Sequence, residues 1–143
     1  MLLTIKFLSE ANYLAIFVAA LAYNALGAIW YSLLFGKVWS KGIEEMGIKM
    51  SLPDKSKMAV IHVKSFLANL LTVLAMAYFI HIDQGYNVMT ALKLGIAAGC
   101  GLTLGSIFMV ANWQGTKPVV VMIDAGYQAI GITLASVIIA VWH

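Results

Sequence analysis

Residues 118–142, PVVVMIDAGYQAIGITLASVIIAVW, decide the fold. The stretch exceeds the roughly 20 mostly apolar residues that a helix needs to cross a bilayer. Pro118 suits the first turn of a helix, where a missing backbone N–H leaves no intrahelical bond unmade. Asp124 carries the one formal charge inside the stretch. The sequence therefore predicts a transmembrane helix with a carboxylate about 9 Å from its start, at ~1.5 Å per residue.

Three further apolar segments precede this one, at residues 13–35, 58–82 and 88–110. The 143 residues are 62% hydrophobic and 10% charged, whereas a soluble domain carries about 25% charged residues. We therefore expect an all-α polytopic membrane protein. The four predicted helices form a four-transmembrane-helix bundle, which makes up a single domain over residues 1–143.

The lysines are divided unequally between the two ends of the predicted spans. The side with the first and third loops holds Lys37, Lys41, Lys49, Lys55, Lys57 and Lys117, and the opposite side holds Lys6 and Lys93. Cytoplasmic loops carry an excess of lysine. The distribution predicts that the first and third loops lie in the cytoplasm and both termini outside. We expect the helices to cross the inner (plasma) membrane.

The first loop is the long connection between the predicted spans, and it has an amphipathic pattern. Trp39, Ile43, Met46 and Met50 recur at helical spacing, with Lys41, Glu44, Glu45 and Lys49 on the other side. This pattern predicts a short interfacial helix that contacts membrane lipids. A solvated linker is the alternative interpretation.

Each predicted helix has a stripe of small and polar residues along one face. Polar side chains in a bilayer normally face protein or water, so these stripes are expected to face the inside of the bundle. Depths along the helices place one layer of side chains in the cytoplasmic half: Asp124, Tyr127, Gln128, His62 and Tyr31. Two asparagines, Asn24 and Asn69, fall near the middle of their spans.

Asp124 is the most informative residue of the predicted layer. An ionisable group at this depth is costly unless it is paired or wetted, and it marks a functional site by default. The alternative is a structural role, in which Asp124 is hydrogen-bonded to Tyr31 or His62 and holds the helices together. Both roles require inward-facing hydrogen-bonding groups, so both remain open at this stage.

Glycines on the third and fourth predicted helices indicate close helix packing. Gly95 and Gly99 lie on one face of the third helix, Gly101 and Gly105 lie on another, and Gly131 belongs to the fourth helix. Small residues four positions apart let two helix backbones approach each other. The third helix is therefore expected to approach two neighbours, within the bundle, in a homo-oligomer or in a larger membrane partner.

Several classes of protein lack their sequence signatures here. There is no histidine or carboxylate spacing typical of a metal site, no local nucleophile–base pair and no phosphate-binding glycine loop. We therefore expect neither an enzyme nor a bound metal or cofactor. The chain contains no arginine, which argues against nucleic-acid binding. The single cysteine, Cys100, excludes an intrachain disulfide.

Both ends of the chain resemble a known family. Residues 12–39, with GAIWYSLLFGKVW at positions 27–39, resemble the opening signature of domain-of-unknown-function family 1761. Residues 117–127, ending in DAGY, resemble its closing helix, as does Trp142 near the end. The resemblance covers essentially the whole chain and is weak in the second span. It implies a small, four-span, mostly bacterial membrane protein without an agreed activity, whose signature residues are Trp30, Tyr31, Asp124, Gly126 and Tyr127.

The sequence departs from the family pattern at two positions. Leu33 follows the Tyr-Ser pair where the family usually has a proline. Gln128 follows the Gly-Tyr pair where a histidine is common. If that histidine handles protons in relatives, its replacement by Gln128 places that role in doubt for this chain.

The polar layer favours a homo-oligomeric channel or carrier for a small solute, an ion or a proton. The alternative function is a structural, accessory or lipid-binding membrane protein that performs no chemistry. Transport that depends on Asp124 would distinguish the two hypotheses.

Overall fold

The computed structural model describes residues 2–49, 54–83 and 86–143, and these residues are almost entirely helical. The elements are α1 (Leu2–Glu10), α2 (Tyr13–Ile29), the π-helix η1 (Trp30–Leu34), α3 (Gly36–Glu44), α4 (Lys55–Ile82), α5 (Val88–Ile96), the π-helix η2 (Ala97–Thr103), α6 (Leu104–Gln114) and α7 (Pro118–Val141). No strand occurs in the described residues. The all-α class is therefore confirmed.

Four helical segments are long and apolar enough to cross a membrane, namely Tyr13–Leu34, Ser56–Ile82, Val88–Gln114 and Pro118–Val141. They confirm the four predicted spans. The third span extends four residues beyond the predicted end at 110, because its polar last turn remains helical until Gly115. Gly115 adopts φ +65°, a left-handed conformation that ends α6 and that glycine adopts without strain.

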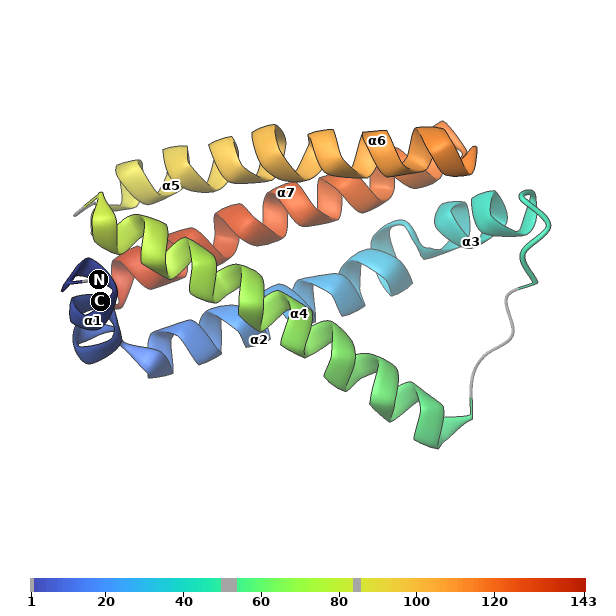
Figure 1. The fold of residues 1–143 in the computed structure, drawn as a ribbon. Coiled ribbons are helices and arrows are strands. Elements are labelled where there is room, and N and C mark those ends of the chain that lie inside the picture. The colour runs from blue at the N-terminus through green and yellow to red at the C-terminus, as the bar shows by residue number, and fades with distance from the viewer. Residues whose placement is uncertain (1, 50–53, 84–85) are drawn as a thin grey trace.

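Helix α7 is the central element of the bundle. In Figure 1 it runs between α5 and α6 on one side and α2 on the other, and α4 crosses α2. The hydrophobic core lies where α2, α4, α5 and α7 meet, and it includes Tyr23, Val73, Ile80, Ile132 and Ala135. The half of the bundle near the termini is thus the better packed half.

The two glycine faces of the third span have different surroundings. A Cβ added at Gly95 would lie 2.7 Å from the Thr133 Cα, and one at Gly99 would lie 2.8 Å from the Ala129 Cα. These glycines let α5 and η2 approach α7 closely. A Cβ at Gly101 or Gly105 would meet no described atom within 4 Å. One predicted neighbour is therefore α7, and no described residue packs against the second glycine face.

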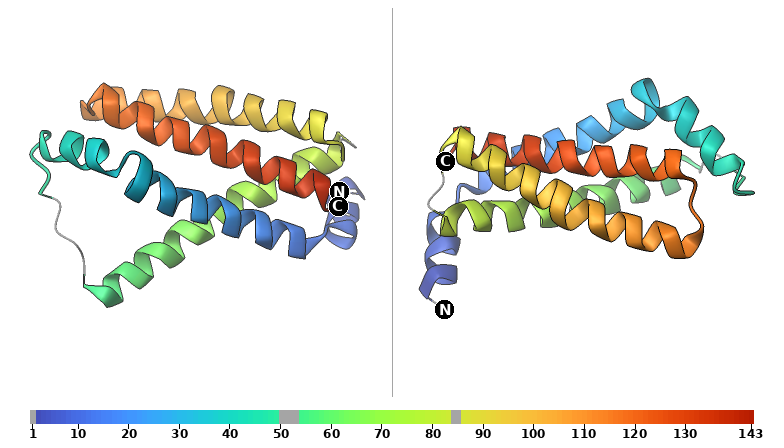
Figure 2. Two further views of the ribbon diagram at one scale, coloured as in Figure 1. Left: turned by 180° about the vertical axis from the view of Figure 1, so that it is seen from behind. Right: turned by 90° about the horizontal axis from the view of Figure 1, so that it is seen from above.

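The first half of α4 stands away from the bundle. Figure 1 and the left view of Figure 2 show α4 diverging from the other helices toward its beginning. Its described side chains from Ser56 to Ser65 are all exposed, whereas Asn69, Val73 and Ile80 are buried. Only the second half of α4 therefore contributes to the core.

The first loop contains the predicted short helix, α3, followed by a turn. Trp39, Ile43 and Met46 are half-buried, whereas the opposite side, with Lys41, Glu44, Glu45 and Lys49, is exposed. The predicted amphipathic helix is thus confirmed from Trp39 to Glu44, where α3 ends. Met46 and Lys49 follow the helix in a turn and an irregular segment, and Met50 lies outside the described residues. Helix α3 also packs on α7, because a Cβ at Gly42 would lie 2.6 Å from a Val120 methyl carbon.

Candidate functional site

Asp124 is held by two hydrogen-bond donors from the other end of the chain. The Tyr31 hydroxyl donates to its Oδ1 atom over 2.7 Å, and the Trp39 indole Nε1 donates to the same oxygen over 2.9 Å. Tyr31 comes from η1 and Trp39 from α3, and their rings pack edge to face with centroids 5.3 Å apart. Both donors therefore fix one carboxylate oxygen from one side.

The π-helix η1 positions these donors. The Phe35 N–H donates to the Trp30 carbonyl over 2.9 Å, five residues back, which is the wide turn of a π-helix. A Cβ at Gly36 would lie 2.5 Å from the Tyr31 carbonyl oxygen. Glycine is thus required where the chain leaves η1 and enters α3, and this change of direction brings Trp39 back over α7.

Two consecutive aromatic residues contact two consecutive residues of α7. The buried Trp30 indole donates to the Ile123 carbonyl oxygen over 3.0 Å, while Tyr31 donates to the neighbouring Asp124. A Cβ at Gly126 would lie 3.2 Å from the Trp30 ring. The first span and α7 are therefore held in one register at the level of Asp124.

A second polar cluster lies one turn further along α7. Asn69 Nδ2 donates to the Tyr127 hydroxyl over 3.1 Å, and that hydroxyl lies 3.4 Å from the Tyr23 carbonyl oxygen, to which it donates. The Tyr23 hydroxyl donates to Gln128 Oε1. The Tyr127 ring also packs against those of Tyr23 and Tyr31, at centroid distances of 5.3 and 5.4 Å. This cluster fills the interior between α2, α4 and α7.

Two open cavities meet at Asp124. One, of about 500 Å³, is lined by Tyr31, Tyr127 and Gln128 together with α6 residues such as Ser106 and Gln114. The other, of about 650 Å³, lies between the end of α3 and the start of α7. Asp124 lines both cavities. Among the described residues its Oδ2 atom has no hydrogen-bond partner, so this oxygen is available to a ligand.

The second cavity is bordered by an ion pair that joins the first loop to α7. Lys117 Nζ donates to the Glu45 carboxylate, and the Lys117 backbone N–H donates to Met46 Sδ over 3.3 Å. The hydrogen bond and the charge of Lys117 hold the pKa of Glu45 below its ordinary value. The described part of the first loop therefore has two polar contacts to the beginning of α7.

The structure brings together most of the predicted layer. Tyr31, Asp124, Tyr127 and Gln128 line one cavity. Asn69 is buried and bonded to Tyr127, as its depth suggested. Asn24 is half-buried and forms no side-chain hydrogen bond to a described residue.

The predicted position of His62 is wrong. His62 is exposed on the first half of α4 and contributes to neither cavity. The prediction assumed that all four helices remain in contact along their full length. The part of α4 that precedes Asn69 diverges from the bundle, and His62 therefore lies away from Asp124.

Two residues of the site were not in the predicted layer. Tyr23 was missed, although Tyr23, Gly27 and Tyr31 follow each other at four-residue intervals, which place them on one helix face. Trp39 was assigned to the membrane interface, and only the sharp turn at Gly36 directs it to Asp124. The position of Tyr23 could therefore have been predicted from the sequence. The position of Trp39 depends on a backbone conformation that the sequence pattern does not specify.

The arrangement suits the binding of a proton or a cation. One oxygen of Asp124 accepts two hydrogen bonds, and the residue lines two cavities. No group of three or more metal-binding side chains occurs in the described part of the chain. The carboxylate is therefore the charged group that Tyr31, Trp39 and the two cavities have in common.

Comparisons with known proteins give one match. A family model described as a protein of unknown function, DUF1761, matches residues 14–140. This range contains all the residues of the site described above. No curated protein and no solved structure matches the chain.

Proposed function

Because the chain belongs to the DUF1761 family of proteins of unknown function and has four helices able to cross a membrane, we propose that it is a small membrane carrier. It moves a proton or a small cation, and Asp124 is the group that binds it. The carrier performs no covalent chemistry and requires no cofactor.

The position of Asp124 between two cavities is the observation that carries this proposal. A carboxylate inside a transmembrane helix is costly unless it is paired or hydrated. A purely structural carboxylate would be enclosed by its hydrogen-bond donors. Here Tyr31 and Trp39 occupy one oxygen, and the carboxylate still lines open space.

A carrier fits the packing better than a continuous pore. Beyond Asp124 the interior is filled by Tyr23, Tyr127 and Gln128, followed by the buried core residues Val73 and Ile80. Access to Asp124 is therefore from one end of the bundle. By the lysine distribution, this is the cytoplasmic end.

The first half of α4 is the segment best placed to close the cavity. It lies free of the bundle, and no described α4 residue lines either cavity. His62 lies about 10 Å along α4 and Asp124 about 9 Å along α7, at ~1.5 Å per residue. Closure of α4 would bring His62 toward the level of Asp124. It would also remove the polar His62 side chain from contact with lipid.

A homo-oligomer accounts for the free face of the third span. Gly101 and Gly105 face open space four residues apart, the spacing that allows close helix–helix contact in membranes. A leucine at either position would prevent that approach. The mass of the purified protein in detergent, measured by light scattering, tests this expectation with Gly101→Leu and Gly105→Leu. A monomeric wild type would contradict it.

Charge-displacement currents test the proposal. Proteoliposomes on a solid support receive pulses of protons, alkali cations or small organic cations. We expect wild-type currents for at least one of these ions. The currents should disappear in Asp124→Asn and persist in Asp83→Asn, which removes an exposed carboxylate at the other end of α4.

Two outcomes would contradict the proposal. One is a wild type without currents above those of empty liposomes. The other is an Asp124→Asn variant whose currents equal those of the wild type. With both proteins folded, either outcome would favour the accessory or lipid-binding function.

A further inference from the structure

A third cavity lies at the opposite end of the bundle, which is the end where Figure 2 shows both termini. It encloses about 190 Å³ between α1, the start of α2, the end of α4 and the end of α7. Its inner wall consists of alanine and isoleucine side chains. The remaining lining residues are Phe7, Glu10, Asn12, Tyr86, Trp142 and His143.

Aromatic rings form much of the wall. Phe7 is buried and packs against Tyr78 and His81, with centroids 5.4 and 5.5 Å apart. The Tyr86 ring stacks on the His143 ring at 4.8 Å and an interplanar angle of 21°. The faces of aromatic rings carry partial negative charge and attract cations.

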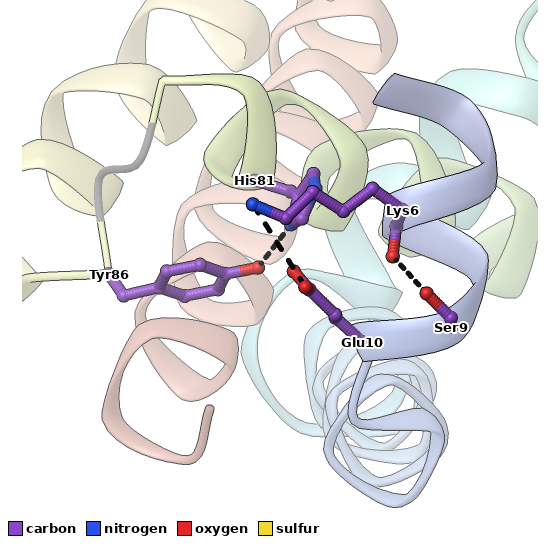
Figure 3. Close-up of polar contacts among 5 residues, drawn as sticks. All are labelled: Lys6, Ser9, Glu10, His81 and Tyr86. Carbon is purple, nitrogen blue, oxygen red and sulfur yellow. Dashed lines mark hydrogen bonds and ion pairs between the residues drawn. The ribbon is translucent and has the colours of Figure 1, made fainter. Parts of the chain in front are cut away.

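Glu10 supplies the formal charge of this cavity. Figure 3 shows its side chain directed toward the Tyr86 hydroxyl, which bonds His81 Nδ1 over 3.0 Å. Burial and the charge of Glu10 raise the pKa of Tyr86, so Tyr86 remains a neutral hydroxyl. Glu10 is the one acidic or lysine side chain among the described residues that line this cavity.

The nearest lysine leaves the Glu10 carboxylate largely available. Lys6 Nζ lies 4.0 Å from Glu10 Oε1, and the two side chains are 60% and 53% exposed. Exposed ion pairs of this kind are weak. Lys6 is also not among the residues that line the cavity.

Helix ends of both polarities lie beside this cavity or its lining residues. α1 ends at Glu10, α4 at Ile82 and α7 at Val141, whereas α2 begins at Tyr13 and α5 at Val88. Helix C-termini carry about half a negative charge and N-termini about half a positive charge, so these ends largely offset each other and Glu10 remains the main negative group. The Asn12 amide donates to the Trp142 carbonyl over 3.1 Å and satisfies part of the α7 end.

We propose that this terminal cavity binds a small organic ammonium ion, with Glu10 as counter-ion and the rings of Phe7, Tyr86 and Trp142 as the surrounding wall. The volume is below the roughly 300–1,000 Å³ of pockets for drug-sized ligands, and it suits an ion of a few heavy atoms. Aromatic walls with a carboxylate are the usual means of binding alkylated ammonium groups. This site is separate from Asp124 and does not depend on the carrier function.

Binding of tetramethylammonium tests this inference. Purified protein in phosphatidylglycerol nanodiscs is titrated at neutral pH, and tryptophan fluorescence and heat are recorded. We expect saturable binding, and about tenfold weaker binding in Glu10→Gln because the counter-ion is lost. Glu44→Gln, which removes an exposed carboxylate at the other end of the bundle, should bind like the wild type.

Further variants keep the result interpretable. Trp142→Leu should weaken binding even where Glu10 is intact, and sodium should not compete with tetramethylammonium at equal concentration. Thermal unfolding of each variant excludes loss of fold as the cause. The proposal is overturned if the wild type does not bind tetramethylammonium, or if Glu10→Gln and Trp142→Leu both bind it with unchanged affinity.

The same titration identifies the source of the ammonium group. In phosphatidylcholine nanodiscs, a lipid headgroup that occupies the cavity would compete and lower the apparent affinity for tetramethylammonium. Equal affinity in the two lipids would indicate a free ammonium compound instead. Both results support an ammonium site, and they differ only in what fills it.

Discussion

The Tyr31 hydroxyl and Oδ1 of Asp124 lie 2.7 Å apart although 93 positions separate the two residues in the chain. This bond joins the π-helical end of the first span to the second turn of α7. Together with the Trp39 indole it holds one oxygen of a carboxylate that lines two cavities. The proposed binding of an ion at Asp124 depends on this position.

Tyr31→Phe should modestly lower the thermal stability of the protein. The substitution removes the hydroxyl and leaves the ring against Trp39 and Tyr127. Hydrogen bonds between transmembrane helices contribute about 1 kcal/mol, so a loss of this size is expected in thermal unfolding. The loss should vanish when Asp124→Ala, which removes the oxygen that accepts the bond, is already present. Tyr78→Phe, whose hydroxyl bonds no described residue, serves as the control.

Gly131→Ala should be strongly destabilising. A Cβ at this position would lie 1.9 Å from a Tyr23 ring carbon, and Tyr23 is fully buried with its hydroxyl bonded to Gln128. Overpacking of this kind costs roughly 3 kcal/mol. Thermal unfolding in detergent measures the effect. Thr4→Ala, which changes an exposed side chain outside the four spans, should unfold like the wild type, and equal stability of the two variants would refute the packing described here.

The Glu45–Lys117 pair should give a small, pH-dependent contribution to stability. Lys117 lowers the pKa of Glu45 from its ordinary value of 4.5. A group whose pKa is lowered by folding stabilises the folded state above its ordinary pKa, and the stabilisation disappears as the pH falls through the lowered value. Wild type should therefore unfold at a higher temperature than Glu45→Gln at pH 6.

The difference between these two proteins should persist to pH values somewhat below 4.5 and then disappear. Glu44→Gln is the matched control, because Glu44 is the neighbouring exposed carboxylate. Equal unfolding temperatures of wild type and Glu45→Gln at pH 6 would show that the pair contributes nothing. The effect is expected to be small because exposed ion pairs are screened by solvent.

Closure of α4 predicts a specific cross-link. In a Cys100→Ala background, His62→Cys combined with Gln114→Cys should form an intramolecular disulfide under mild oxidation and should stop transport. Lys64→Cys points about 200° away around the helix from position 62, so it should cross-link poorly with the same partner. Equal yields for positions 62 and 64, or none for either, would argue against a closing movement of α4.

The sequence allowed the spans and much of the site to be predicted, for physical reasons that apply to particular residues. Long apolar runs have few alternatives to a membrane helix. Polar side chains within these runs, such as those of Tyr31, Asp124 and Asn69, are then expected to face each other inside the bundle and not lipid. The depths of Tyr31 and Asp124 along their helices were sufficient to place them in one layer.

The rest depended on backbone irregularities. Apolar periodicity does not distinguish an α-helix from the π-turn at Trp30–Leu34, so the return of Trp39 to Asp124 was not predicted. Depth along a helix predicts neighbours correctly only where the helices run side by side. The divergence of α4, which separates His62 from the layer, was therefore not predicted. Helix α1 was also not expected, because Leu2–Glu10 is too short to span a membrane.

One labelling measurement tests most directly whether Asp124 binds its ion from a cavity open to one side. Asp124→Cys and Ser106→Cys, each in a Cys100→Ala background and in vesicles of known orientation, are exposed to a membrane-impermeant thiol reagent. We predict that both cysteines react from the side that carries Lys117 and not from the side of the termini. If neither cysteine reacts from either side while the proteins remain folded, Asp124 is an enclosed structural residue and the proposed carrier site does not exist.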